Sequence, residues 1–262
     1  MLSKMLDKLL IALPTKGRAD TINKHTWSWL QYIKEQFVVW VEREEFEEYS
    51  RIIPKDHLVV LPKSNQGLGY AKEQIKKFAE ENEFEYIFKV DDDIAGWCDA
   101  TRGSSKKGEA GAKVLKQALQ DCIEELEKHP QVGAIGFPYR NEMWDVKKWV
   151  SVNGRLQTAY ISRTKDFHAD KRISHFEDLA HFINLRAHNR STLRYGLIGI
   201  DCEPVGKNAG GHQLMDRGTQ AQSEIDLIRS EIYPALRVKR VFDKAWNFEP
   251  DLKGGIFTGA KL

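Results

Sequence analysis

The chain has 262 residues, with 40 lysines and arginines against 38 aspartates and glutamates, and its net charge is +2. This length allows one large domain or two small ones, and the near-balanced charge means that a polyanionic partner must be met by a local basic patch. No apolar run approaches the ~20 residues of a membrane-spanning helix, and no secretion signal is readable. Three widely separated cysteines indicate free thiols in a reducing compartment, so we expect a cytoplasmic protein that does not bind membranes.

The first part of the chain alternates short apolar runs with helical patterns. Apolar, β-prone runs predict strands at residues 9–13, 37–41, 58–61 and 86–90. Helix formers with apolar spacing predict helices at residues 21–36, 44–49 and 70–82. Alternating strands and helices are typical of βαβ units, so the sequence predicts an α/β fold with a mostly parallel sheet flanked by helices.

The remainder of the chain is less regular. A segment rich in glycine, serine and lysine at residues 101–111 predicts a flexible loop. Further strands are expected at residues 132–137, 158–162, 197–200 and 236–241, and further helices at residues 114–126, from 176 onward and 223–231. Without a repeat or a clear linker, we expect a single domain in two lobes, with nucleotide-type features in 1–110 and acceptor-type features in 111–262.

Three consecutive carboxylates, Asp91, Asp92 and Asp93, directly follow the strand expected at residues 86–90. They would lie at the carboxyl end of a sheet, where open α/β folds bind ligands. Close anions repel one another, and Mg²⁺ or Mn²⁺, often shared with substrate phosphates, would offset that repulsion. An acidic turn that only solvates the strand end is the alternative. Because crossovers between parallel strands are right-handed, the loops after the other strands should reach the same edge.

Such an acid cluster among strand-end loops suits an enzyme that uses a nucleotide sugar. A metal would bridge the diphosphate and neutralise the charge that grows on the leaving group. Asp93 would hold the metal and Asp91 would face the ribose or sugar, while Asp92 could point to either because side chains alternate at a strand end.

Several other residues have both a binding and an ordinary interpretation. Thr15 and Arg18 precede a helix and suit a nucleotide or phosphate, although a surface arginine beside a capping Asp20 is equally consistent. Glu42 at a strand end could hydrogen-bond a uridine base or ribose. The glycine loop that starts at Gly67 allows close approach to a ligand, but any strand-to-helix turn may use glycine.

Later in the chain, Glu177 and Asp178 begin a helix, where acidic residues often only cap the helix. Transfer to a hydroxyl with inversion needs a base, and Asp178 is the candidate. His212 could complete a metal site or touch a phosphate, or do neither. Basic and aromatic residues could bind a phosphate backbone and stack a base, although charge runs are usually solvated: Arg102, Lys106, Lys107, Lys147, Lys148, Trp149, Arg237, Lys239 and Arg240.

Four motifs together resemble one family. They are IALPTKGRA at 11–19, VWVE at 39–42, LPKSNQGLGYA at 61–71 and KVDDDI at 89–94. As a set they are similar to the TET-associated glycosyltransferases, a bacteriophage group with a GT-A type fold. The later FEDL at 176–179 is similar to the acidic helix start where such enzymes keep their base.

The resemblance implies transfer of a hexose or pentose from a UDP-sugar to a hydroxymethylated pyrimidine in double-stranded DNA, such as 5-hydroxymethylcytosine. It implies Mn²⁺ or Mg²⁺ as cofactor and protection of phage DNA from host nucleases, hence action in the host cytoplasm. Carried over to this sequence, the residues that bind the nucleotide sugar would be Pro14, Thr15, Arg18, Glu42, Gln66, Gly67, Tyr70, Asp91 and Asp92. Asp93 would hold the metal and Asp178 would contact the acceptor hydroxyl, while His212 is a candidate metal ligand from the sequence alone.

Other functions stay open from the sequence. The same fold and chemistry could serve a polysaccharide, protein or small-molecule acceptor. A catalytically inactive domain could bind nucleic acid or protein through the same cleft. A nuclease would use clustered aspartates but would leave the nucleotide-type loops unexplained.

Overall fold

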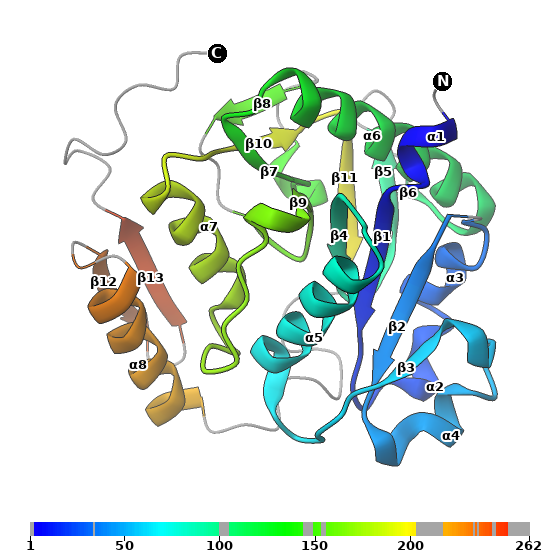
Figure 1. The fold of residues 1–262 in the computed structure, drawn as a ribbon, viewed down its shortest axis with the longest axis horizontal. Coiled ribbons are helices and arrows are strands. Elements are labelled where there is room, and N and C mark those ends of the chain that lie inside the picture. Colours follow the sequence, from blue (N-terminus) through cyan, green and yellow to red (C-terminus); the bar gives the residue numbers. More distant parts are fainter. Residues whose placement is uncertain are drawn as a thin grey trace.

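The computed structural model describes residues 3–33, 35–99, 105–143, 149–152, 156–202, 217–232, 234, 236–242 and 245–250. Its centre is an eight-stranded sheet (Figure 1). In spatial order the strands are β3 (Leu58–Val60), β2 (Phe37–Val41), β1 (Leu9–Pro14), β4 (Tyr86–Val90), β9 (Ala159–Arg163), β7 (Val132–Gly136), β10 (Ser191–Tyr195) and β8 (Trp149–Val152). The sheet takes strands from both sides of residue 110, and the predicted boundary between two lobes stays a prediction.

Strand direction decides which loops share an edge. Neighbours among β3, β2, β1 and β4 are parallel, β9 is antiparallel to both β4 and β7, and β10 is parallel to β7. Strands β7 and β10 therefore point the same way as β4, and only β9 and the outer strand β8 are reversed. The mostly parallel sheet predicted from the sequence is confirmed, and the start of β9 lies at the carboxyl edge of β4.

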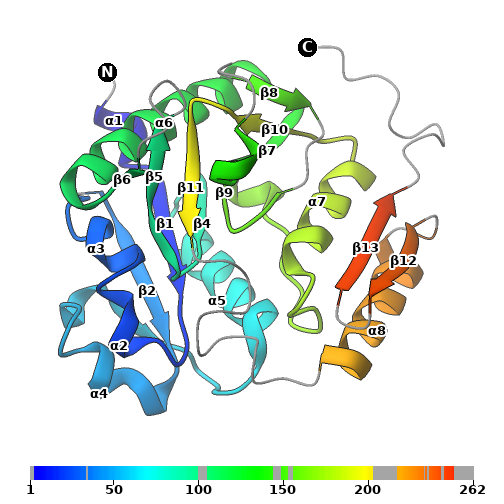
Figure 2. The same cartoon turned by 180° about the vertical axis from the view of Figure 1, so that it is seen from behind.

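Alternating side chains of β1 build a core on each face of the sheet. Leu9, Ile11 and Leu13 pack with residues of α3 (Thr26–Leu30) and α6 (Gly108–Lys128). Leu10 and Ala12 pack with residues of α5 (Gly67–Glu81) and α7 (Glu177–Ala187), which cover the opposite face (Figures 1 and 2). This two-residue period is what a strand buried on both faces requires.

Smaller elements complete the described part of the chain. A second sheet has the order β11 (Ile198–Cys202), β5 (Ile94–Asp99) and β6 (Ser105–Lys106). Helix α8 (Arg217–Leu227) continues into a π-helical turn, Ile228–Ile232, and the hairpin of β12 (Leu236–Phe242) and β13 (Ala245–Pro250) follows. Short helical turns are α1 (Ser3–Leu6), α2 (Ala19–Ile22), α4 (Phe46–Tyr49), Arg43–Glu45, Lys55–His57, Arg140–Glu142 and Thr164–Asp166. None of the described helices is long and apolar enough to cross a membrane.

Two sequence predictions of local structure are wrong. The helix expected at residues 21–36 is split into α2 and α3, because His25 between them has a non-helical backbone (φ −119°, ψ −128°). The loop expected at residues 101–111 already contains β6 and the start of α6 at Gly108, whose φ of +54° turns the chain from one to the other. Strands β5, β8, β10 and β13 were not predicted, since their runs are short or interrupted by polar residues.

Candidate active site

The register of β1 and β4 brings two of the expected loops together. Ala12 pairs with Lys89, so Thr15 and Asp92, three residues further along each strand, face one another at the carboxyl edge. Thr15 Oγ1 donates to Asp92 Oδ2 at 2.6 Å. The Arg18 guanidinium pairs with Asp92, and its Nη1 lies 3.2 Å from Asp93 Oδ2. Thr15, Arg18 and the acid cluster thus form one site.

Tyr49, at the end of α4, holds the loop that carries Thr15 and Arg18. Its hydroxyl lies 2.8 Å from Thr15 Oγ1 and accepts the Arg18 backbone N–H at 3.0 Å. The Tyr49 side chain is fully buried. The loop is therefore fixed from behind, and the arginine is aimed at the carboxylates.

The acid cluster carries more negative than positive charge. Burial raises the pKa of Asp92, which Arg18 opposes. The pKa of Arg18 is raised although burial works against its charge, because Asp92 and Asp93 outweigh burial. Burial, with Asp93 and Glu177 nearby, raises the pKa of Asp91 to about 7 against the effect of Lys89. A site with these properties favours an added cation.

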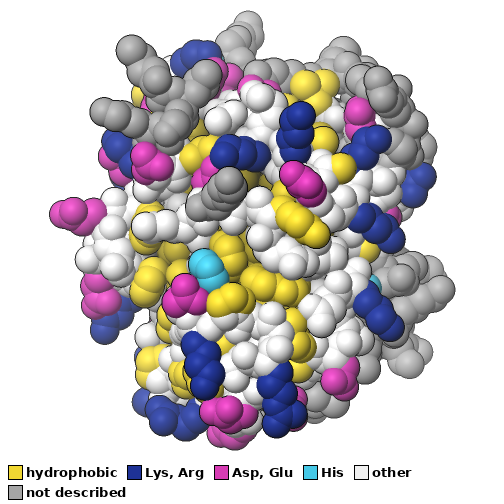
Figure 3. All heavy atoms as spheres, turned by 90° about the vertical axis from the view of Figure 1, so that its right-hand side faces the viewer, with side chains coloured by type: hydrophobic (Ala, Val, Ile, Leu, Met, Phe, Trp, Pro, Cys, Tyr) yellow, Lys and Arg dark blue, Asp and Glu magenta, His cyan; other side chains and the backbone are white. Residues whose placement is uncertain are grey.

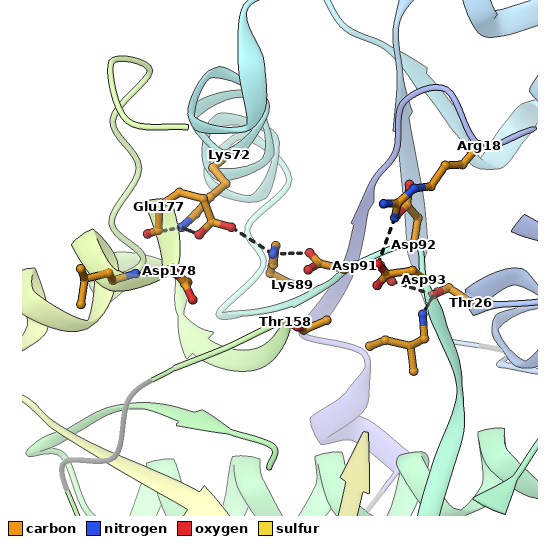
Figure 4. A network of polar contacts seen from close by, with 12 residues as sticks. Arg18, Thr26, Lys72, Lys89, Asp91, Asp92, Asp93, Thr158, Glu177 and Asp178 are labelled. Atoms are coloured by element: carbon orange, nitrogen blue, oxygen red, sulfur yellow. Dashed lines mark hydrogen bonds and ion pairs between the residues drawn. The ribbon is translucent and has the colours of Figure 1, made fainter. Parts of the chain in front are cut away.

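A buried network extends from the acid cluster to the start of α7 (Figure 4). Lys89 pairs with Asp91, and its Nζ lies 3.1 Å from Glu177 Oε1. Lys72 Nζ lies 3.2 Å from Glu177 Oε2 and 3.1 Å from the Glu177 carbonyl oxygen. Both lysines are fully buried and lie over the ring of Tyr160, at 5.5 Å for Lys72 and 5.9 Å for Lys89. Glu177 is thus the common partner of two buried cations.

Asp178 has a different environment from Glu177 beside it. Successive helix residues point about 100° apart, so Glu177 turns to the buried network while Asp178 remains partly exposed. Asp178 Oδ1 accepts the backbone N–H of Leu179 at 2.7 Å. In Figure 4, Thr158 lies between Asp178 and the acid cluster, and its carbonyl oxygen accepts the Asp91 N–H at 3.2 Å. The carboxylates expected for donor and acceptor therefore border the same region.

Glu42 joins two strand-end loops. Its carboxylate is buried, with Oε1 2.9 Å from Lys16 Nζ and Oε2 accepting the Asn65 backbone N–H at 2.7 Å. Asn65 has a φ of +58°, which asparagine tolerates better than most residues. Glu42 thus shapes the rim of the site, and its expected contact with a nucleotide stays a prediction.

The glycine loop at the start of α5 lies against residues 173–174 of the chain, where a ligand was one possibility from the sequence. Gly67 has a φ of +82°, and a Cβ added there would lie 2.3 Å from Ser174 Oγ. A Cβ added at Gly69 would lie 2.1 Å from the Ile173 carbonyl oxygen. These glycines let α5 start directly against the segment that leads into α7.

The other expected nucleotide contacts differ in exposure. Gln66 is exposed. Pro14 is the last residue of β1 and pairs with Trp40 of β2. Tyr70 belongs to α5, and its side chain packs in the core between that helix and the sheet. Their roles in binding stay predictions.

The expected metal ligands can be tested in part. Asp93 is partly exposed at the edge, and His212 lies outside the described residues. Among the residues that are described, no three His, Cys, Asp or Glu side chains converge on one point. Mg²⁺ is commonly held by one or two carboxylates plus substrate phosphates, so the oxygen ligands of the acid cluster fit a cation that the substrate helps to bind.

The expected DNA contacts are mostly untested. Arg102, Lys147 and Lys148 lie outside the described residues, and only the backbone of Trp149, in β8, is described. Lys106 pairs with Trp97 in β5, which leads the chain away from the acid cluster, so the backbones of Lys106 and Asp93 are on the order of 13 Å apart. Lys107 follows it and is exposed. On the side shown in Figure 3, basic and acidic side chains are interspersed around apolar ones.

Sequence reasoning missed the roles of Lys89 and Tyr49. Lys89 interrupts an otherwise apolar strand, YIFKV, and this break in the pattern was the available signal. Nothing local marks Tyr49, which meets Thr15 only through the fold.

Comparisons with known proteins identify a family for the sequence and similar solved structures for the fold. A family model described as TET-Associated Glycosyltransferase matches residues 9–211. The fold is similar to glucosyl-3-phosphoglycerate synthase from Mycobacterium tuberculosis in complex with Mg²⁺ and UDP (TM-score 0.51, 10% identity, 95% of this chain and 92% of that chain). A structure of that enzyme with Mn²⁺, UDP-glucose and phosphoglyceric acid is also similar (TM-score 0.51, 9% identity, 95% and 91%). The predicted GT-A type fold is confirmed. No curated protein matches the sequence.

Proposed function

Because the chain belongs to the TET-associated glycosyltransferase family, it is a glycosyltransferase, and we propose that it transfers a sugar from a UDP-sugar to 5-hydroxymethylcytosine in double-stranded DNA. The observation that carries the proposal is the joining of Thr15, Arg18 and the acid cluster into one site at the carboxyl edge of the sheet. The similar mycobacterial structures hold UDP or UDP-glucose with Mg²⁺ or Mn²⁺. A DNA acceptor implies a cytoplasmic reaction, in the host cell if a phage encodes the chain.

The acid cluster would bind the donor. Asp93, with His212 as a further candidate, would hold Mg²⁺ or Mn²⁺, which when bound supplies positive charge to the leaving diphosphate. Asp92 is anchored by Thr15 and Arg18 and would keep Arg18 beside the diphosphate. Lys89 fixes Asp91, which would receive a hydroxyl of the ribose or sugar. Glu42, Pro14, Gln66, Gly67 and Tyr70 complete the expected set of donor contacts.

Asp178 would act as the base for an inverting transfer. The acceptor hydroxymethyl oxygen forms a bond with the anomeric carbon, the bond from that carbon to the UDP oxygen breaks, and the hydroxyl proton goes to Asp178. The hydrogen bond from Leu179 N–H to Oδ1 fixes the orientation of the Asp178 carboxylate.

The hydroxymethyl group on C5 projects into the major groove, and flipping its base out of the stack would bring it into such a site. The candidates for holding the DNA during that step are Arg102, Lys106, Lys107, Lys147, Lys148 and Trp149.

The test is incorporation of labelled sugar into DNA. The purified chain is incubated with a panel of UDP-sugars and duplexes that contain 5-hydroxymethylcytosine, with Mn²⁺, with Mg²⁺ and with EDTA. Duplexes of the same sequence with 5-methylcytosine are the matched control, because they lack only the hydroxyl. We expect incorporation that needs both the metal and the hydroxymethyl group. UDP release without incorporation into DNA would show that the acceptor is not this DNA. Incorporation in the presence of EDTA would show that the reaction does not need the metal.

A further inference from the structure

Helix α8 lies beyond residue 211, where the family match ends, yet it reaches the candidate active site. Its residue Glu224 is buried, with only 1% of the residue exposed. Ile228, which follows α8, is fully buried and belongs to the same core cluster as Leu179 and Phe182 of α7. Helix α8 and the turn that follows it are therefore packed directly on α7.

The Glu224 carboxylate binds the two backbone N–H groups that directly precede α7. Its Oε2 accepts the N–H of His175 at 2.8 Å and the N–H of Phe176 at 3.2 Å. Its Oε1 lies 3.1 Å from His175 Nδ1. Phe176 is the N-cap residue of α7, and no side-chain cap hydrogen bond is formed by that residue itself. Glu224 thus supplies, from another helix, an acceptor for the N-cap N–H, which is the role of the N3 glutamate in a capping box.

Burial and charge show that this contact is tightly held. Burial disfavours the charge of Glu224, but the hydrogen bonds from His175 and its neighbours outweigh burial and lower the pKa of Glu224. A carboxylate at a helix N-terminus also interacts favourably with the helix dipole. The residues that follow the bound N–H groups are Glu177 and Asp178. The direction in which Asp178 points therefore depends on where Glu224 holds the helix start.

We propose that Glu224 is a positioning residue for Asp178, so that α8 is part of the active-site framework of this glycosyltransferase. The inference rests on the proposed role of Asp178 as the base. Removing Glu224 takes away the carboxylate that both N–H groups bind, and the first turn of α7 then shifts or frays. Misplacement of a catalytic group by about 1 Å can cost on the order of 100-fold in rate.

Three variants of Glu224 separate the effect of its charge from the effect of its side-chain length. Glu224→Ala removes the acceptor, Glu224→Asp keeps the charge but is one methylene shorter, and Glu224→Gln keeps an oxygen for the two N–H groups. We expect Glu224→Ala and Glu224→Asp to lower kcat by about 10- to 100-fold with the KM for UDP-sugar nearly unchanged, and Glu224→Gln to retain most of the rate. Glu231→Gln is the matched control, because Glu231 also ties this segment to the loop before α7, through an exposed pair with Arg172 at 2.7 Å.

Two further measurements keep this test separate from the test of the proposed function. Hydrogen exchange of amides at residues 175–179 should be faster in Glu224→Ala than in wild type, whatever the acceptor is. In an Asp178→Asn background, Glu224→Ala should cost little additional rate, because both act on one group. Unchanged exchange, faster exchange with normal kcat, or a full additional loss in the Asp178→Asn background would each overturn the positioning role. A fully active Asp178→Asn variant would instead refute the base assignment.

Discussion

Glu177→Gln is the substitution that tests the buried network most directly. Glutamine has nearly the same shape as glutamate but no charge, so the change removes the shared partner of Lys72 and Lys89 with little change in packing. Lys89 would keep the carboxylate of Asp91, whereas Lys72 would keep the carbonyl oxygen of residue 177, at 3.1 Å, and the Tyr160 ring but no carboxylate. Burial already lowers the pKa of Lys72. Lys72 is therefore the cation that the substitution leaves most poorly compensated.

Two estimates of the stability lost in Glu177→Gln agree in size. Breaking a buried ion pair by removing one partner costs about 3–5 kcal/mol. Burial alone would raise the pKa of Glu177, but Lys72 and Lys89 lower it from 4.5 to about 2, which corresponds to about 3 kcal/mol. We therefore expect Glu177→Gln to lower the free energy of unfolding at pH 7 by about 3–5 kcal/mol.

Urea unfolding of wild type and Glu177→Gln at several pH values is the assay. Because the pKa of Glu177 is lower in the folded than in the unfolded chain, its stabilisation is complete above about pH 4.5 and is lost as the pH falls towards about 2. The difference between the two proteins should shrink in that window. Glu231→Gln, which breaks an exposed pair, should leave the free energy of unfolding nearly unchanged. A loss below about 1 kcal/mol for Glu177→Gln, or a difference independent of pH, would refute the network as a source of stability.

Three other substitutions address the site and its support. Asp93→Ala should abolish metal-dependent UDP binding, measured by calorimetry with and without Mn²⁺, while leaving the melting temperature nearly unchanged; unaltered binding would remove the metal role. Asp178→Asn should lower kcat by about 10²–10⁴-fold without changing donor affinity, and a normal kcat would exclude it as the base. Gly69→Ala should destabilise the fold by roughly 1–3 kcal/mol in urea, because the added Cβ would lie 2.1 Å from the Ile173 carbonyl oxygen, and an unchanged midpoint would contradict that contact.

Local pattern was enough to predict the part of the site that lies directly after strands. The apolar run of β4 ends in three carboxylates, and parallel strands place Thr15 and Arg18 at the same edge, where the structure has them. This convergence needs only strand direction and handedness, which short segments encode.

The site contacts that the sequence did not predict join segments that are far apart in the chain. The sequence marks Glu42 as a strand-end acid, but not that Lys16 and Asn65 occupy its carboxylate. Lys89 is an unusual residue for a buried strand, yet its partner Glu177 lies 88 residues later. Glu224 is one of many helical glutamates until α8 is seen against α7. Such contacts depend on register and helix packing, which no local window contains.

The reversed strand β9 has a consequence for how the chain is made. β9 pairs with β4 on one side and β7 on the other, although it is synthesised after both. Until residues 159–163 leave the ribosome, β4 has one unpaired edge of backbone N–H and C=O groups, and β7 is unpaired on both sides because its other neighbour, β10, is synthesised later still. Such edges recruit other chains, so a fragment that stops before β9 would be prone to aggregate. Nascent chains of this protein should need β9 before the two parts of the sheet become one.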